Sequence, residues 1–229
     1  RVQPFYLASQ FEGVGELPPG LHLSPRHVKA RAGEQPKPME ISLESQVILL
    51  APGVEAGHVA DEVARLSTMT PVYAELQAQY PYLFYWQYTS LETGVHSSYP
   101  GHGGYPTGYD PRKRAWYTGA IDTGGLTWSP LIVDASTRQI TITASMPVLK
   151  PDGTVAGVTA IDVAIVDVLR GINVQSGLPK GTRTFLVKGA SESETSAKKI
   201  QIFAGQVEAG ADWRANIDLG WLESADERT

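Results

Sequence analysis

Regular alternation of side chains over residues 138–149 constrains the fold of this chain more than any other feature. Apolar residues occupy every second position, which predicts a half-buried β-strand. Pro151-Asp152-Gly153 predicts a hairpin turn, and in the returning strand Val158, Ala160 and Asp162 share one face. An antiparallel sheet is therefore expected, with Asp162 at the end of a mostly apolar row. The alternating residues are Ile140, Ile142, Ala144, Met146 and Val148 opposite Thr141, Thr143 and Ser145.

Helices and further strands are expected earlier in the chain. Residues 40–50 form an increasingly apolar run that predicts a sheet strand. Residues 58–69 carry apolar side chains at helical spacing, and a second short helix is expected over residues 70–80, with Thr70 as its cap and a proline at its first position. Together with the sheet, these helices predict an α+β fold in which an antiparallel sheet carries flanking helices.

An aromatic-rich hairpin is expected over residues 83–99. Residues 83–89 and 95–99 predict two strands joined by a turn at Glu92-Thr93-Gly94. Because side chains alternate along a strand, Trp86 and Tyr88 share one face. One of the two faces is a candidate lining for a pocket. A further short strand is expected over residues 127–133.

The chain is expected to contain more than one structural part. Residues 1–40 are rich in proline and predict an N-terminal extended segment without an assigned role. Residues 41–174 are expected to form a module with a ligand pocket. Residues 175–229 predict strands at 184–188 and 199–204 and a helix near Asp212, and about 55 residues are few for an independent core. They are therefore expected to be the start of an incomplete second module.

Composition excludes several classes of function. A formal net charge of −5 argues against a nucleic-acid partner. The absence of cysteine removes thiolate catalysis and zinc–thiolate sites, and the five histidines lack the spacing of metal ligands. No apolar run approaches about 20 residues, so no membrane span is expected within this chain. No cofactor, metal or catalytic motif is predicted, and the chain is not expected to be an enzyme.

Cations and aromatic residues are most concentrated in residues 109–117. Asp110-Pro111 favours extended geometry, and the following residues can begin a short helix whose first amides attract anions. Arg112 and Arg114 would diverge on a helix, so only one is expected to point inward. A guanidinium near the Trp116 indole is a good partner for a carboxylate. The segment predicts the mouth of a small-molecule pocket; a capped surface helix with solvated cations is the alternative.

Three motifs follow one another within residues 40–170. They are D-P-R-K-R-A-W-Y at 110–117, S-P-L-I-V-D-A at 129–135 and G-V-T-A-I-D-V at 157–163. In this order they resemble the double Cache family, the extracytoplasmic sensor domains of bacterial chemoreceptors, histidine kinases, cyclases and membrane-bound serine phosphatases. The resemblance implies a PAS-like fold and a membrane anchor through flanking segments outside this chain. Residues 99–117 and 213–226 look most like sensors of sporulation-type serine phosphatases.

Many members of this family resemble an amino-acid-binding type, and its motif implies ligand-binding residues here. Tyr109, Arg114 and Trp116 match the group that holds the ligand carboxylate. Asp134 and Asp162 match two of the three groups that hold its ammonium. The third, a tyrosine in the family, falls on Ile132, which removes a hydroxyl and should alter recognition of the amino group. The proline that usually precedes the tryptophan is Ala115, which affects backbone geometry only.

Charge complementarity supports such a site independently of the family resemblance. A zwitterion needs fixed cations at one end and fixed anions at the other, and two dry carboxylates without a cation would be costly. The structural alternative makes Asp134 a turn residue, Asp162 a helix cap, Tyr109 and Trp116 core residues, and Arg114 a salt-bridge partner. An acyclic amino acid is one candidate ligand, and a small polar or carboxylate-bearing molecule is the broader expectation.

The expected function is extracytoplasmic sensing of a small molecule by a membrane-anchored receptor, with occupancy relayed to a cytoplasmic output. A non-sensing protein-interaction module is the alternative, because calcium-channel alpha-two-delta subunits resemble the same pattern around residues 109–117. A hydrolase would require Asp134 and Asp162 to act as acid and base, and their association with Arg114 favours binding instead. A homodimer is left open.

Overall fold

The computed structural model describes residues 5–8, 20–29, 35, 37–165, 167–168, 185–188 and 201–205. The chain divides into two compact units, Arg1–Ala164 and Ile165–Thr229. In the second unit, β11 (Phe185–Lys188) and β12 (Gln201–Gly205) pair antiparallel, so the two strands expected there are present. The helix expected near Asp212 lies outside the described residues. The division at residues 40 and 174 stays a prediction.

An eight-stranded sheet forms the centre of the first unit. Among its described strands, every neighbouring pair is antiparallel except β1 and β4, which run parallel. The α+β fold with an antiparallel sheet is confirmed. Across the sheet the strands are β1 (Phe5–Ala8), β4 (Val47–Leu50), β6 (Val95–Tyr99), β5 (Trp86–Leu91), β10 (Val155–Ala164), β9 (Ile140–Leu149) and β7 (Thr127–Trp128), and β8 (Ile132–Val133) also pairs with β9.

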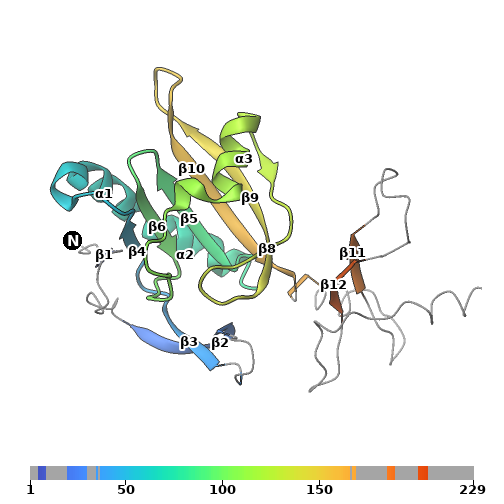
Figure 1. The fold of residues 1–229 in the computed structure, drawn as a ribbon. Helices are drawn as coiled ribbons and strands as arrows, with labels where there is room; N and C mark the ends of the chain where they lie inside the picture. The colour runs from blue at the N-terminus through green and yellow to red at the C-terminus, as the bar shows by residue number, and fades with distance from the viewer. Residues whose placement is uncertain are drawn as a thin grey trace, which may run out of the picture. The chain divides into compact units, whose positions relative to one another are not determined.

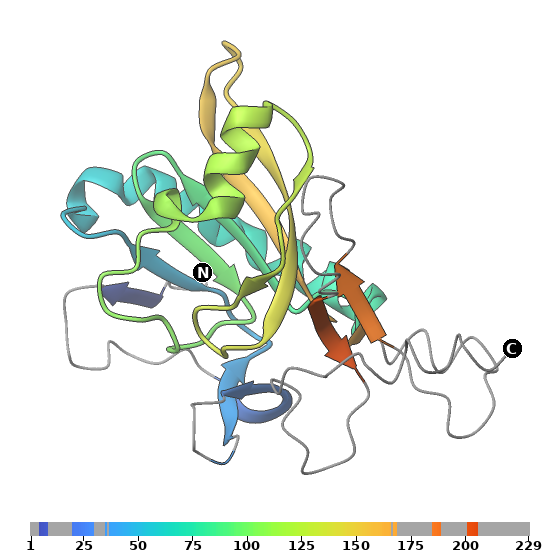
Figure 2. The same ribbon diagram turned by 45° about the vertical axis from the view of Figure 1, so that its right-hand side comes forward.

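Helices cover both faces of this sheet (Figures 1 and 2). On one face lie η1 (Ala56–Val59), α1 (Ala60–Leu66), η2 (Ser67–Met69) and α2 (Thr70–Gln79); on the other lie η3 (Pro111–Lys113) and α3 (Ala115–Thr123). Alternation along β5 explains the division, because Gln87 donates to the Tyr73 carbonyl of α2 while Trp86 and Tyr88 join a core cluster with Trp116 of α3. The two helices expected over residues 58–80 are confirmed. Thr70 is not the cap of the second one: it is the first residue of α2, Met69 is the N-cap, and the Thr70 hydroxyl donates to Gln46 instead.

Some strands are shorter or more broken than the sequence predicts. The strand expected over residues 40–50 is two strands, β3 (Lys37–Ser42) and β4, separated by residues 43–46. The strand expected over residues 127–133 is also two, since Ser129-Pro130 interrupts it and proline offers no N–H to the ladder. The aromatic strand begins at Trp86, three residues after the expected start.

A hairpin of β2 (Leu21–Lys29) and β3 is tied to the start of β5. The Arg26 guanidinium donates to the carbonyls of Pro81, Tyr82 and Phe84 at 2.7, 3.0 and 2.8 Å. The His27 ring is 3.0 Å from the Tyr85 carbonyl. Part of the N-terminal segment therefore braces the aromatic strand that leads to the candidate site.

The hydroxyl-bearing face of β9 is the buried one. Thr141, Thr143 and Ser145 are at most 1% exposed, whereas Met146 on the apolar face is 48% exposed. The buried face carries polar partners: Ser145 donates to the Trp116 carbonyl at 2.8 Å and Thr143 donates to Asp162 at 2.5 Å. Buried hydroxyls are tolerated when they are hydrogen-bonded. Those of Ser145 and Thr143 bond toward α3 and the cavity described below, whereas the Thr141 hydroxyl has no hydrogen-bond partner among the described residues.

Replacing Gly157 by alanine is expected to destabilise the sheet by roughly 2–3 kcal/mol, the upper part of the range for overpacking. Gly157 pairs with Leu91 across β5 and β10, and a Cβ atom there would lie 2.1 Å from the Ser90 carbonyl oxygen. The backbone would have to shift. Urea denaturation would measure the loss, and Gly125→Ala is the control because a Cβ there meets nothing within 4 Å. Equal unfolding midpoints for the two variants would contradict the prediction.

Candidate ligand pocket

A cavity lies on the α3 face of the sheet. Its empty volume is about 370 Å³ when the open solvent at its mouth is included. The centre of a water molecule can occupy about 20 Å³ of it, room for one or two waters. All six residues predicted for the site line it, namely Tyr109, Arg114, Trp116, Ile132, Asp134 and Asp162.

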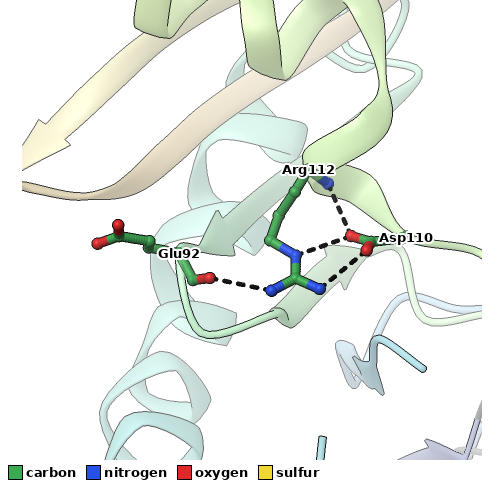
Figure 3. A network of polar contacts seen from close by, with 3 residues as sticks. All are labelled: Glu92, Asp110 and Arg112. Atoms are coloured by element: carbon green, nitrogen blue, oxygen red, sulfur yellow. Dashed lines mark hydrogen bonds and ion pairs between the residues drawn. The ribbon is translucent and has the colours of Figure 1, made fainter. Parts of the chain in front are cut away.

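The turn around η3 decides which arginine reaches the cavity. Asp110 caps η3 by accepting from the Arg112 backbone N–H at 3.0 Å. The Arg112 guanidinium donates back to the Asp110 carboxylate at 2.9 and 2.8 Å and to the Glu92 carbonyl at 3.2 Å, as Figure 3 shows. Arg114 has extended backbone geometry between η3 and α3 and lines the cavity. Only one of the two arginines contributes to the pocket, as expected.

Arg114 forms the cationic end of the cavity. Its guanidinium carbon lies 5.9 Å from the centre of the Tyr109 ring. Within the described part of the chain, no carboxylate or carbonyl pairs with this guanidinium. Burial raises the pKa of the Tyr109 hydroxyl, which therefore stays protonated at neutral pH. A cation and a hydroxyl donor are thus available to an anionic group in the cavity.

Asp162 forms part of the acidic end. It lies in β10, opposite Trp86 of β5 and Thr143 of β9, and its Oδ1 accepts from the Tyr88 hydroxyl at 2.7 Å and from Thr143 at 2.5 Å. Burial, reinforced by the nearby Asp134 carboxylate, raises the pKa of Asp162 to about 7. The helix-cap alternative for Asp162 is wrong, because β10 continues to Ala164.

Asp134 both shapes a turn and lines the cavity. Its Oδ2 accepts from the backbone N–H groups of Ser136 and Thr137 at 3.2 and 2.6 Å and from the Thr137 hydroxyl at 2.5 Å. Burial raises the pKa of Asp134, although these bonds oppose the rise. The Trp86 indole is close enough to act on that pKa, yet its N–H has no hydrogen bond of good geometry within the described residues. The turn role therefore does not exclude a pocket role.

Two histidines and a tyrosine line the cavity although the sequence did not predict them for the site. The His102 Nδ1 accepts from the Gly104 N–H at 3.1 Å, and the His96 ring nitrogens lie 2.6 Å from Ser90 and 2.9 Å from the Tyr105 hydroxyl. Burial lowers the pKa of His96 to about 3 and that of His102 well below its usual value, so both rings are neutral. Because side chains alternate along a strand, His96 of β6 lies on the same face of the sheet as Tyr88 of β5. This placement could be predicted only if the register between β5 and β6 were known.

The described residues contain no group of three or more histidine, aspartate or glutamate side chains arranged to hold a metal ion. No helix among those residues has both the length and the apolarity to cross a membrane. The cavity is lined mainly by aromatic rings, two neutral histidines, one cation and two carboxylates, a combination that suits an organic ligand with separated charges.

Part of the chain matches a known protein family. Residues 66–169 match the model of the first PDC sensor domain of methyl-accepting chemotaxis protein-like receptors. This part of the chain is similar to a chemoreceptor sensor module. The matched residues include α2, α3 and the strands β5 to β10, and thus every described residue that lines the cavity. The resemblance to a sensor family is confirmed at this level, and the double Cache arrangement stays a prediction.

Solved chemoreceptor domains are also similar to this PDC-like module. The ligand-binding domain of Pseudomonas fluorescens CtaA in complex with L-valine is 27% identical, with 45% of this chain and 46% of that chain covered and a TM-score of 0.39. The domain of the Pseudomonas aeruginosa amino acid chemoreceptor PctC in complex with GABA is 30% identical, with coverages of 45% and 46% and a TM-score of 0.39. The match spans about half the length of these domains.

Proposed function

We propose that this chain is an extracytoplasmic sensing domain that binds a small zwitterion, an amino acid or a close analogue, in the cavity beside Trp116. The observation that carries the proposal is that two buried carboxylates line the same cavity as one arginine, Arg114, that has no ion-pair partner among the described residues. The match of residues 66–169 to a chemoreceptor sensor domain supports it, and so do the named amino acid ligands of the similar domains.

The charges of the cavity favour a ligand with a carboxylate and an amine. Arg114 and the protonated Tyr109 hydroxyl offer donors to a carboxylate. Asp134 and Asp162 are buried acids with raised pKa values, and an ammonium group between them would favour their ionised forms. The ligand carboxylate would supply the negative charge that Arg114 lacks, and the ligand ammonium would supply the positive charge that Asp134 and Asp162 lack. A zwitterion should therefore bind better than a molecule with only the carboxylate or only the amine.

The receptor context belongs to the same proposal. The domain is anchored by flanking membrane segments, and ligand occupancy shifts the population of its conformations and so biases a cytoplasmic output. The motif resemblance favours a serine phosphatase or a histidine kinase as that output. The double Cache arrangement would add the remainder of a second module beyond the PDC-like module. A homodimer is compatible with this arrangement.

Titration calorimetry of the 229-residue chain with the common amino acids tests the proposal. At least one amino acid is expected to bind, and its amide and its deamino analogue should each bind at least about tenfold more weakly, since hydrogen bonds to charged groups contribute about 1.5–3 kcal/mol. Equal affinity for the amino acid and its deamino analogue would show that Asp134 and Asp162 do not hold an amine. Absence of binding by every amino acid would overturn the proposed function.

A further inference from the structure

The two carboxylic acids of the cavity are held by different kinds of donor. Asp134 accepts from two backbone N–H groups and from the Thr137 hydroxyl. Among the described residues, Asp162 accepts hydrogen bonds only from hydroxyls, those of Tyr88 and Thr143. A backbone N–H can only donate, and it bonds a carboxylate more strongly than a neutral acid, whereas a hydroxyl can also turn and accept from a protonated acid. The ionised form is therefore favoured more at Asp134 than at Asp162.

The charges of the cavity balance when Asp162 is protonated. Of the described residues that line it, Arg114 is the one cation, and Asp134 and Asp162 are the acids. Ionising both acids would leave a net negative charge at a buried site, which is costly without a counter-ion. Burial and the nearby Asp134 carboxylate accordingly raise the pKa of Asp162 to about 7. With one proton on Asp162, the empty cavity holds one cation and one anion.

The other titratable side chains around Asp162 are neutral near pH 7. Burial raises the pKa of the three tyrosine hydroxyls that line the cavity and lowers the pKa of its two histidines. His27 packs against the Trp86 ring, with 4.3 Å between the ring centres, and burial lowers its pKa to about 4. A proton that leaves the cavity near pH 7 would therefore come from the pair of acids. The neutral lining groups are Tyr88, His96, His102, Tyr105 and Tyr109.

We propose that an amine-bearing ligand expels the proton from Asp162 when it binds, so that the domain responds to the acidity of its surroundings as well as to its ligand. This inference rests on the proposed function, because it places the ligand ammonium beside Asp134 and Asp162. The ammonium supplies the positive charge that stabilises the ionised Asp162 carboxylate, and the displaced proton passes to the solvent. Ligand and proton thus oppose each other, and acidification weakens ligand binding.

The expected size of the effect follows from the pKa of Asp162, which is about 7 in the empty cavity. Below this pH the unliganded domain holds a proton that the complex lacks, so the affinity falls as the pH drops. Binding is expected to be about tenfold weaker at pH 6 than at pH 8. About 0.9 protons should be released per ligand at pH 6 and about 0.5 at pH 7.

Titration calorimetry of the 229-residue chain measures this release. The probe is the common amino acid that binds tightest at pH 8, titrated at pH 6 and pH 7 in PIPES and in imidazole, two buffers with different ionisation enthalpies. The difference in binding heat between the buffers gives the number of protons released. The affinity is measured from pH 6 to pH 8. The deamino analogue of the probe should release no proton, because it brings no ammonium.

Two variants identify the source of the proton. Asp162→Asn cannot hold the proton, so its release at pH 6 should fall below about 0.2 protons and its weakened affinity should change less than about twofold between pH 6 and pH 8. Asp122→Asn removes a carboxylate at an exposed position of α3 and should release as many protons as the parent.

The outcomes separate this inference from the proposed function. Amino acid binding without proton release at pH 6 overturns the inference and leaves zwitterion sensing intact. Release that Asp162→Asn leaves unchanged, in a variant whose thermal unfolding remains cooperative, also overturns it, because the proton would then come from another group. Equal release by the amino acid and its deamino analogue would show that the ammonium is not the cause. Absence of binding by every common amino acid overturns both proposals together.

Discussion

Arg114→Ala is expected to weaken binding of the tightest amino acid ligand by about 30- to 100-fold. Truncation of one partner in a desolvated charge pair costs about 2–5 kcal/mol, and the lower end applies because Arg114 is only half-buried. Arg114→Lys keeps the charge but loses the planar pair of donors, so an intermediate loss is expected. Calorimetry on the three proteins would measure these differences.

Lys113, the cation next to Arg114 in the sequence, provides the control for this prediction. Lys113 is exposed, and Lys113→Ala changes the net charge by the same amount next to the same site. Its affinity should stay within about twofold of the parent, as expected of a solvated surface charge. If Lys113→Ala weakened binding as much as Arg114→Ala, the effect would be one of general electrostatics, and Arg114 would not hold the ligand carboxylate.

Asp162→Asn is expected to stabilise the unliganded domain by about 2–4 kcal/mol at pH 8 while it weakens amino acid binding at least about 30-fold. The pKa of Asp162 rises from 3.8 to about 7 on folding, and each unit corresponds to about 1.4 kcal/mol. At pH 8 the folded protein must hold a buried carboxylate in its unfavourable ionised form. Asparagine is neutral, and its Oδ1 can still accept from Tyr88 and Thr143.

The pH dependence of stability follows from the same shift. Between about pH 4 and pH 7 the folded chain holds a proton on Asp162 that the unfolded chain has lost, so the free energy of unfolding falls as pH rises through this window. In Asp162→Asn this slope should be smaller. Part of it should remain, because burial also raises the pKa of Asp134.

Urea denaturation at pH 4, 5, 6, 7 and 8 would measure the stabilisation at pH 8 and the slope of stability with pH. Asp122→Asn is the control, at an exposed position of α3. The control should follow the parent at every pH. An Asp162→Asn variant that is less stable than the parent at pH 8 would contradict the prediction and would indicate that the ionised carboxylate is compensated in the unliganded domain. A binding site that destabilises its own fold in this way is common where a ligand supplies the missing charge.

The sequence predicted most of the local structure because local structure depends on periodicity. The helices over residues 58–80 and the hairpin of β9 and β10 follow from spacings of 3.6 and 2 residues. Strand ends were predicted less well. The interruption at Ser129-Pro130 and the late start of β5 depend on which backbone groups find partners across the sheet.

The candidate site was predicted in part. Its six residues were assigned from motif resemblance, and the structure brings all six to one cavity. His96, His102 and Tyr105 were not predicted, since an isolated histidine or tyrosine in a strand or a glycine-rich loop carries no spacing signal. Whether any of these residues contacts a ligand stays a prediction until binding is measured.

The sequence by itself determined that the chain forms an antiparallel sheet with flanking helices and that only one of two neighbouring arginines points inward, because these features depend on residues close together in the chain. Only the tertiary structure decided that β9 buries its hydroxyl face and that Asp134 and Asp162 meet at one cavity beside Ile132. The hydrogen bond from Tyr88 to Asp162 joins residues 74 positions apart. Such contacts follow from strand register and order, which the pattern of a single strand does not specify.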